Sequence, residues 1–309
     1  MTEMEQLKEV APSPCGPLCG GVGEASLLQT AEGGALRNLT DLYADAQLRP
    51  PDWGKVTQLA PNIAVYWLCI SLLTWYMRRL VVSNRPTAEQ DRLSAAERAF
   101  SEYRQTNLAI ALLHSLLSAV WSAAILLRYR RVIFYEEDAS IMFWSDSLYQ
   151  LAQLSVAYFL HDSVDMLRHE PKARFALELL AHHAACVVLF LMALLPRKLL
   201  PYIATSLVME INSTLLHTRS LMKLSGADGE RRRLFRLVEL LCLLSLLVCR
   251  LGMQLLHAYW LYRDYTKMHR FYTTFILMGA LGFVYVNALL FLRLLRSFTR
   301  PIAASKKEA

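Results

Sequence analysis

The chain has 309 residues, of which 55% are hydrophobic and 19% are charged, and its formal net charge is +7. The apolar residues fall in blocks of about twenty, which argues against a soluble globular fold and is typical of membrane-spanning helices. The basic residues are spread among the segments between these blocks, without a concentrated patch interleaved with aromatic residues. We therefore expect anionic membrane lipids as the counter-charge, and no nucleic acid as a partner.

Seven membrane-spanning helices are predicted, forming one all-α polytopic bundle. A hydropathy window of about 19 residues places them at 59–82, 106–127, 146–167, 174–195, 199–224, 234–261 and 270–296. We expect residues 1–57 to form a polar N-terminal tail, residues 58–297 to form the transmembrane domain, and residues 298–309 to form a C-terminal tail.

The distribution of basic residues predicts the orientation of these helices. The first, third and fifth loops and the C-terminal tail together hold more of the 33 Lys and Arg residues than the opposite side does. By the positive-inside rule, the N-terminus is expected in the lumen and the C-terminus in the cytosol. Asn38 begins an Asn-Leu-Thr sequon, which can be glycosylated only on the lumenal side.

The last four residues, "KKEA", resemble a dilysine retrieval signal that coat proteins read from the cytosol. Lys306 and Lys307 stand fourth and third from the end, and such a signal is an address and not an anchor. The alternative interpretation is an ordinary basic tail. The sequence thus predicts the endoplasmic reticulum membrane, with the plasma membrane as the alternative location.

Ionisable residues are concentrated at one depth of the predicted bundle. The stretch "FLHDSVDML" at 159–167 places His161, Asp162 and Asp165 late in the third span, and "LLAHHAACV" at 179–187 places His182 and His183 early in the fourth. With the expected topology, all five belong to the cytosolic half or the midplane. Because a charge at mid-bilayer costs at least about 2.5 kcal/mol, these groups should face one another or a wet cavity.

The fifth predicted span adds a polar stripe at a similar depth. Glu210, Ser213, Thr214 and His217 follow the spacing i, i+3, i+4, i+7, which places them on one helical face. Asn212 and Arg219 lie on the adjoining face. Pairing Glu210 with His182, or Asp165 with Arg219, would reduce the cost of burial, and the sequence does not choose between such pairs.

Other polar residues either line the same cavity or bond neighbouring helices. They are Asn107, His114, Ser118 and Ser122 in the second span, Arg250, Gln254 and His257 in the sixth, and Asn287 in the seventh.

The histidine pair favours acid and base chemistry over a metal site. Metal ligands on one helix prefer a spacing of three or four residues, whereas His182 and His183 are adjacent and point about 100 degrees apart. We therefore expect one histidine to face the cavity and the other to bond a neighbouring helix. A carboxylate beside a histidine suits a general base whose tautomer is held by that partner, and no metal is expected.

The run "HDSVDM", "LLAHHAACVVL" and "LVMEINSTLLHTRSLMKLSG" resembles the TLC-domain family of membrane proteins, which includes the ceramide synthases. The resemblance covers roughly residues 60 to 297. It implies that an acidic motif, a histidine pair and a polar following span form the functional region. The matching positions are Asp162, Asp165, His182, His183, Glu210, Asn212, His217 and Arg219.

One segment departs from the ceramide synthase pattern. Those enzymes carry an H-D-x-x-D-type segment after the histidine pair, where this chain has "MEINSTLLH". The resemblance is therefore nearer to the non-synthase TLC domain-containing proteins, which are associated with phospholipid acyl composition and membrane fluidity.

Three functions follow as hypotheses. The first is lipid homeostasis, in which a polar intramembrane cavity influences phospholipid acyl composition. The second is a lipid acyltransferase of ceramide-synthase type, with acyl-CoA as co-substrate and no bound cofactor. The third is a non-catalytic trafficking or scaffold protein, and the oligomeric state stays open. The expected catalytic residues are His182, His183, Asp162, Asp165 and Glu210. The expected substrate-binding residues are His161, Asn212, His217, Arg219 and His114.

Overall fold

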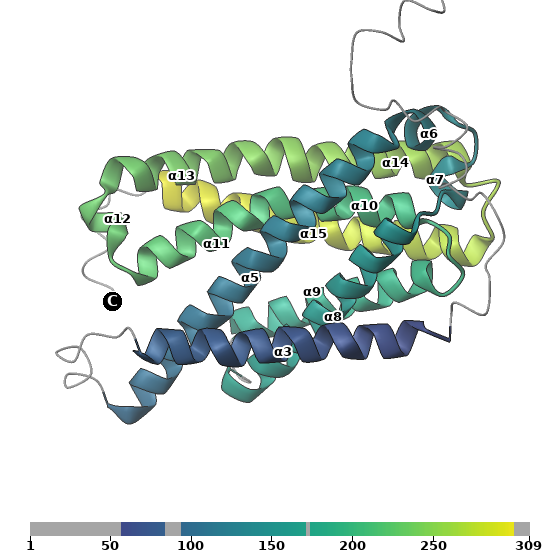
Figure 1. The fold of residues 1–309 in the computed structure, drawn as a ribbon. Coiled ribbons are helices and arrows are strands. Elements are labelled where there is room, and N and C mark those ends of the chain that lie inside the picture. The colour runs from purple at the N-terminus through teal and green to yellow at the C-terminus, as the bar shows by residue number, and fades with distance from the viewer. Residues whose placement is uncertain (1–56, 84–93, 171–173, 300–309) are drawn as a thin grey trace, which may run out of the picture. The chain divides into compact units, whose positions relative to one another are not determined.

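The computed structural model describes residues 57–83, 94–170 and 174–299, and all regular elements in these ranges are helices (Figure 1). The predicted all-α fold is confirmed. Asn38, Lys306 and Lys307 lie outside the described residues. The helices are α3 (Leu59–Ser83), α5 (Ala95–Arg128), α6 (Arg130–Tyr135), α7 (Ala139–Met142), α8 (Asp146–His169), α9 (Arg174–Leu194), α10 (Leu200–Val208), α11 (Glu210–Leu224), α12 (Ala227–Glu230), α13 (Arg232–Ser245), η1 (Leu246–Leu251), α14 (Gly252–Asp264) and α15 (Arg270–Thr299).

Four helices are long and apolar enough to cross a membrane: α3, α5, α9 over residues 176–194, and α15. The other predicted spans have helical counterparts. The helix α8 has 24 residues and is more polar, and the fifth and sixth spans are interrupted. The bundle is thus an all-α membrane fold in which the more polar helix α8 is largely buried between its neighbours.

The fifth and sixth spans are not the single α-helices that hydropathy predicts. The fifth is divided at Met209, where the Met209 amide bonds the Ser206 carbonyl and the Asn212 amide bonds the Met209 carbonyl, each at 3.0 Å. These i to i+3 bonds make a tighter turn between α10 and α11. The sixth is α13, a π-helical turn (η1) and α14 in succession. A hydropathy window averages over about 19 residues, so it does not detect such local changes in backbone hydrogen bonding.

The second span begins eleven residues earlier than hydropathy predicts, because α5 has a strong N-terminal cap. The Ser94 hydroxyl accepts a bond from the Glu97 amide, and the Glu97 carboxylate accepts one from the Ser94 amide at 2.9 Å. This reciprocal capping box satisfies two amides that would otherwise lack partners. The added turns carry Tyr103 into the interior of the bundle, where it is 2% exposed.

The helix α5 is the central helix of the bundle and packs against α3, α8, α10 and α11. Small residues on its buried face, among them Ser115, Ser118, Ala119 and Ser122, let the neighbouring backbones approach closely. The helix α8 packs between α3 and α9, and α13 and η1 pack on α11 and α15.

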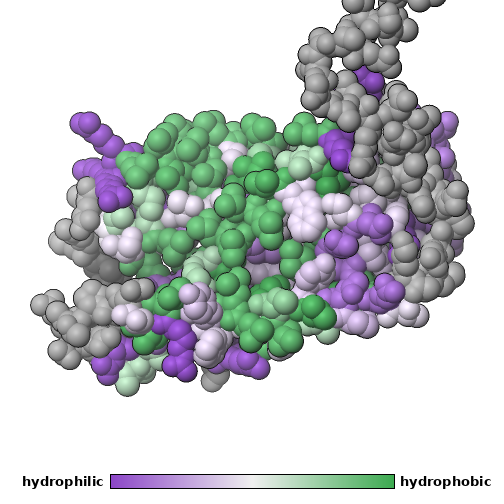
Figure 2. All heavy atoms as spheres, in the orientation of Figure 1, coloured by the Kyte–Doolittle hydropathy of each residue, from purple (hydrophilic) through white to green (hydrophobic). Residues whose placement is uncertain are grey.

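Apolar side chains gather across the middle of the face shown in Figure 2, and hydrophilic residues gather toward its two ends. Large apolar side chains are exposed on several helices, including Leu72 (58%), Val120 (61%) and Leu281 (61%). Soluble monomers rarely expose contiguous apolar surface on this scale. The surface is therefore suited to contact with lipid chains.

Polar contacts close the half of the bundle in which α10 begins and α14 ends. The Ser140 hydroxyl donates to the Asp264 carboxylate at 2.5 Å, and Arg263 donates to both residues. Nearby, Thr205 lies 2.6 Å from the His257 ring. These contacts join α7, α10 and α14 at this end of the bundle.

Candidate functional site

The bundle contains a cavity of about 1070 Å³, whose histidines and charged residues lie in the half opposite these contacts. Its walls come from the first part of α5, the second part of α8, the first part of α9, and from α11, η1 and α15. A volume of this size is at the upper end of the range for small-molecule sites in proteins. The cavity is therefore large enough for a lipid-sized ligand.

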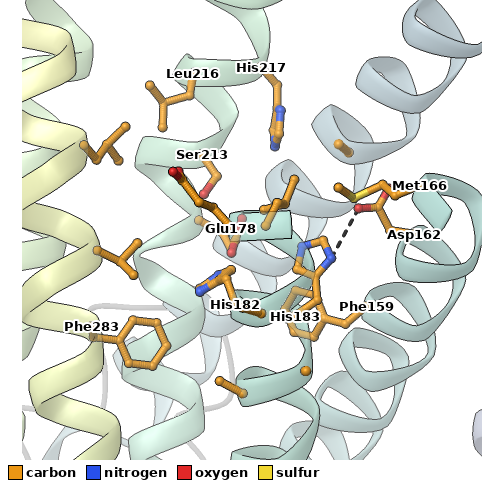
Figure 3. A pocket seen from close by; sticks show the side chains of 18 of the residues that line it. Phe159, Asp162, Met166, Glu178, His182, His183, Ser213, Leu216, His217 and Phe283 are labelled. Carbon is orange, nitrogen blue, oxygen red and sulfur yellow. Dashed lines mark ion pairs between the residues drawn. The ribbon is translucent and has the colours of Figure 1, made fainter. Parts of the chain in front are cut away.

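A histidine and an aspartate meet in the wall of this cavity (Figure 3). His183 Nδ1 on α9 lies 3.3 Å from Asp162 Oδ2 on α8, at ion-pair distance but without hydrogen-bond geometry. Asn107 on α5 donates to the other oxygen of Asp162 at 2.5 Å. Because His183 and Asp162 are only 5% and 4% exposed, three helices hold this pair away from bulk water.

Its neighbour His182 also lines the cavity. The His182 ring meets Phe283 of α15 edge-on at 5.6 Å, and its Nε2 lies 3.6 Å from the Cys186 sulfur. The expectation that only one histidine of the pair faces the cavity is wrong. Adjacent residues are about 100 degrees apart around a helix, and the cavity is wide enough for both side chains to line it, with ring centroids 5.8 Å apart.

The α11 wall carries Glu210, Ser213 and His217. Arg250 of η1 reaches this wall, since its guanidinium donates to the Ser213 hydroxyl at 2.9 Å and to the Asn287 carbonyl of α15 at 3.0 Å. The predicted polar stripe on the fifth span thus faces an arginine of the sixth.

His114 lies deeper in the same cavity and is held rigidly. Its ring stacks on Tyr158 with centroids 3.8 Å apart, and its Nε2 lies 3.1 Å from the Ser118 hydroxyl and 3.4 Å from that of Ser155. A side chain with these contacts shapes the inner end of the cavity.

Three of the predicted site residues do not line the cavity. Asp165 faces α3, where Arg78 lies 3.6 Å away, and also contacts His169. His161 faces Trp67, with ring centroids 6.1 Å apart. Asn212 is fully buried, and its amide nitrogen donates to the Cys242 carbonyl and the Ser245 hydroxyl, both at 2.8 Å.

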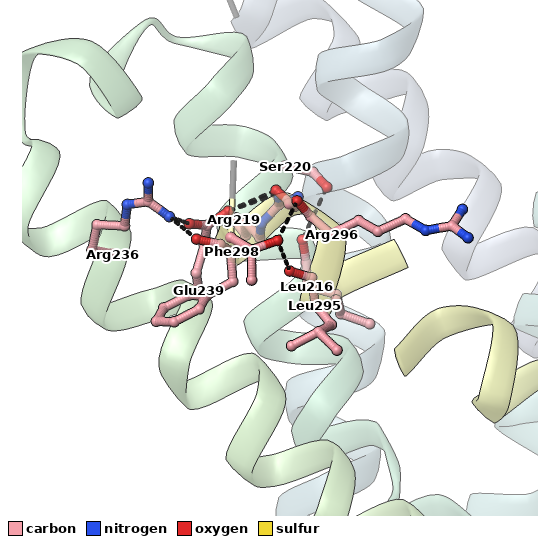
Figure 4. Close-up of polar contacts among 10 residues, drawn as sticks. Leu216, Arg219, Ser220, Arg236, Glu239, Leu295, Arg296 and Phe298 are labelled. Carbon is pink, nitrogen blue, oxygen red and sulfur yellow. Dashed lines mark hydrogen bonds and ion pairs between the residues drawn. The ribbon is translucent and has the colours of Figure 1, made fainter. Parts of the chain in front are cut away.

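Arg219 lines the cavity, but its guanidinium is occupied elsewhere (Figure 4). It donates to Glu239 at 2.9 Å and to Ser297 at 2.5 Å, while Arg236 donates to the other oxygen of Glu239 at 3.0 Å. The pairing of Asp165 with Arg219, which the sequence left open, is not the one formed. This cluster instead ties the C-terminal end of α15 to α11 and α13.

The remaining wall, between α9 and α15, is mainly apolar. Val188 and Leu189 of α9 and Phe275, Met278, Val286 and Leu290 of α15 are among its lining residues. At its edge Arg293 donates to Glu178 at 2.6 Å. The helices approach closely at Gly279, where a Cβ atom would lie 3.1 Å from the Leu189 side chain.

Sequence reasoning gave Arg250 and Asn107 only a secondary place and missed Glu239. The available signal for Glu239 was a lone acid within an otherwise apolar stretch of the sixth span. Within the described ranges, no group of three or more His, Cys, Asp or Glu side chains is arranged to hold a metal ion.

Residues 104–296 match the model of the TLC domain. TLC domain-containing protein 2 of Danio rerio is 26% identical over 195 residues, which is 63% of this chain and 76% of that protein. The human TLC domain-containing protein 1 is 28% identical over 209 residues (67% and 80%), and human protein 2 is 27% identical over 234 residues (76% and 80%). No solved structure matches the chain.

The bundle and its enclosed polar cavity define a helical membrane protein. The TLC-domain match extends over more than half of the chain, so the protein belongs to the TLC-domain family of membrane proteins, whose members are linked to lipid biology.

Proposed function

We propose that this protein acts in lipid homeostasis, binding a lipid in its intramembrane cavity and thereby influencing the acyl composition of membrane phospholipids. The observation that carries the proposal is the division of the cavity into a polar wall, with Asp162, His183 and Arg250, and an apolar wall between α9 and α15. A lipid has the same division into a head group and hydrocarbon chains.

The cost of burying the polar wall supports a polar occupant. Ionisable side chains within the membrane are expensive and are retained where they pair, relay protons or contact a substrate. His182, Glu210 and His217 line the cavity without an ion-pair contact among the described residues. A lipid head group would supply hydrogen-bond partners at this depth, and the chains would lie against the apolar wall.

One contact also favours the second candidate, an acyl-CoA-dependent lipid acyltransferase. With Asp162 beside Nδ1, His183 has Nε2 left to take a proton from a lipid amine or hydroxyl. That oxygen or nitrogen would attack the thioester carbon, the new ester or amide bond would form, and the coenzyme A thiolate would leave and take up the proton. No bound cofactor is needed. The non-catalytic trafficking or scaffold role is the third candidate.

We further propose that the protein resides in the endoplasmic reticulum membrane, with the N-terminus in the lumen and the cavity in the cytosolic half. The distribution of basic residues, the Asn38 sequon and the dilysine-like Lys306 and Lys307 support this orientation. Coat proteins would then be partners of the C-terminal tail. The plasma membrane is the alternative.

The two aspartates of α8 provide a matched test. Asp162→Asn changes a carboxylate in the cavity wall, whereas Asp165→Asn changes one that is equally buried, three residues away and outside the cavity lining. Cells expressing wild type, either variant or the His182→Ala, His183→Ala double variant at equal abundance would receive labelled fatty acid. The acyl composition of their lipids would then be measured.

We expect the wild type and Asp165→Asn to shift phospholipid acyl labelling, and Asp162→Asn and the double variant to lose the shift. If catalysis by His183 is involved, the labelling rate should fall by about 100-fold or more. Equal shifts with all four proteins would contradict a role of the cavity and favour the scaffold.

A further inference from the structure

The sixth span contains a local irregularity at the level of the cavity. Residues Leu246–Leu251 form a π-helical turn between α13 and α14, and Arg250 belongs to this turn. Such turns are rare, cost regular hydrogen bonding, and are found frequently at functional sites. Here the turn presents an arginine to the cavity in the middle of an apolar span.

Arg250 lines the cavity and has no carboxylate in contact. Its guanidinium donates to neutral oxygens only, those of Ser213 and Asn287. Within the part of the chain that the structure describes, no acidic oxygen lies at ion-pair distance from it. Glu210 attracts it electrostatically from farther away.

Other arginines in the bundle have a different environment. Arg219 contacts Glu239 at 2.9 Å, Arg263 contacts Asp264 at 2.7 Å, and Arg78 lies 3.6 Å from Asp165. A permanently charged guanidinium buried in a low-dielectric interior is costly unless an anion accompanies it. These three arginines each have a carboxylate partner within the protein, whereas Arg250 could still bind an anion from outside it.

Unpaired donors near Arg250 point to the same conclusion. Its own Nε is buried without a hydrogen-bond partner, as are the Asn287 amide nitrogen and the side-chain amide of Gln254, one helical turn beyond Arg250. Each unmade bond in a buried site costs free energy. Of these side chains Arg250 lines the cavity, so an anion with several acceptor oxygens bound there would meet its free donor, whereas Asn287 and Gln254 are not among the lining residues.

We infer that Arg250 binds the anionic head of the cavity's lipid, and that this lipid is an acyl chain ending in a carboxylate or a phosphate. The inference rests on the proposed function and names the ligand class for the same site. A guanidinium bonds both anions through two parallel N–H donors. The hydrocarbon chain would run along the α9 and α15 wall, where Phe283 and Val286 lie within one helical turn of the Asn287 side chain that Arg250 contacts.

The test uses the full-length protein, purified into phosphatidylcholine nanodiscs. Three photoreactive probes with the same acyl chain would be compared: a fatty acid, a lysophosphatidic acid and the neutral fatty alcohol. The variants are Arg250→Gln, Arg250→Lys, which keeps the charge, and Arg236→Gln, which removes an arginine outside the cavity lining. Thermal unfolding of each variant in the same nanodiscs would show that it is folded.

We expect the wild type to prefer at least one anionic probe over the alcohol by at least about tenfold. Arg250→Gln should abolish this preference, Arg250→Lys should restore part of it, and Arg236→Gln should leave it unchanged. The preferred anion identifies a carboxylate or a phosphate as the natural head group.

Equal labelling of the wild type by the acids and the alcohol would overturn the anion site and leave the lipid cavity standing. An anion preference that survives in Arg250→Gln would overturn the assignment to Arg250. Labelling by none of the three probes would count against the proposed lipid-binding function itself. The wild-type comparison needs no variant, so it holds even if Arg250→Gln fails to fold.

Discussion

The polar wall of the cavity, to which α5, α8, α11, η1 and the first part of α9 contribute, differs from the α15 side of the apolar wall in how it is held. Half of the apolar stretch of α5 is buried inside the bundle, against 6% of that of α15. On the polar wall, Asn107, Asp162 and His183 contact one another across three helices. Along the other wall α15 presents apolar side chains and is anchored mainly near its C-terminal end. The polar wall is therefore held by side-chain contacts between helices, whereas most of the α15 wall lacks such contacts among the described residues.

The largest effect is expected from removing Glu239, whose contacts with Arg219, Arg236 and Ser297 hold the C-terminal end of α15. Glu239→Ala leaves Arg219 and Arg236 without the carboxylate that both contact, and Glu239 is only 3% exposed. Because one partner of a buried ion pair is removed, unfolding should become easier by about 3 kcal/mol. Thermal or denaturant unfolding in detergent would measure this loss.

Glu178→Ala is the control for that experiment, since the Glu178 pair with Arg293 is nearly half exposed. Solvent screening limits its expected effect to less than about 1 kcal/mol. Equal losses in the two variants would show that the Glu239 cluster is no anchor.

Packing offers a second contrast between the walls. Leu151 of α8 is fully buried, and Leu281 of α15 is 61% exposed. Leu151→Ala should cost about 2 kcal/mol, the low end for a buried leucine, because lipid is as apolar as the protein interior and mainly packing is lost. Leu281→Ala should cost less than about 0.5 kcal/mol. The same unfolding measurement applies, and a large loss at Leu281 would reveal an additional contact of α15.

Two glycines of α15 sharpen the comparison where α15 meets α9. At Gly282 an added Cβ has open space, whereas at Gly279 it would lie 3.1 Å from Leu189. Gly282→Ala should therefore stabilise the protein by about 0.5–1 kcal/mol through helix propensity. Gly279→Ala should not change the free energy of unfolding, because crowding against Leu189 offsets the gain in helix propensity. Equal gains in thermal stability would mean that the two helices separate easily at Gly279.

The smallest effect is expected at the start of α5, outside the apolar span. Bonds from the Ser94 side chain and amide lower the pKa of Glu97 below its ordinary value of 4.5. A lowered pKa in the folded state means that the capping contribution is present above pH 4.5 and is lost as the pH falls through the folded value. Amide exchange protection in the first turn of α5 should fall in that range.

Glu97→Gln is the control, because its side chain does not titrate, so protection of the first turn should not change with pH in the same range. A wild-type profile that matches this variant would rule out the carboxylate as the cause. The cap matters to the polar wall because it sets the start of the helix that carries Asn107.

The sequence predicted the helical class from residue type alone, and it grouped the histidine pair with Asp162, all three of which line the cavity. Blocks of apolar residues predict helices in a membrane protein, because the backbone must satisfy its own hydrogen bonds in lipid. The positions of His182, His183 and Asp162 within their predicted spans placed them at a similar expected depth. It did not separate Asp162 from Asp165. Residues three apart differ by about 60 degrees around a helix, which is enough for one to contact α9 and the other α3.

Tertiary contacts decide the features that were missed. The tight turn at Met209 and the π-helical turn at Arg250 depend on which carbonyl each amide reaches, and hydropathy carries no such information. Likewise, the sequence shows that Glu239 is an acidic residue in an apolar span, where burying its charge costs free energy. Its partners come from helices distant in the sequence, so their identity could not be deduced.

The histidines and charged residues that line the cavity lie in the half of the bundle opposite the contacts of Ser140, Asp264 and Arg263, whereas its apolar α15 wall continues from Phe275 to Leu294. If a lipid binds there as proposed, its head group would lie in one leaflet of the bilayer. Any change in composition that this protein causes would begin as an asymmetry between leaflets. The other leaflet would follow only as fast as lipids cross the membrane.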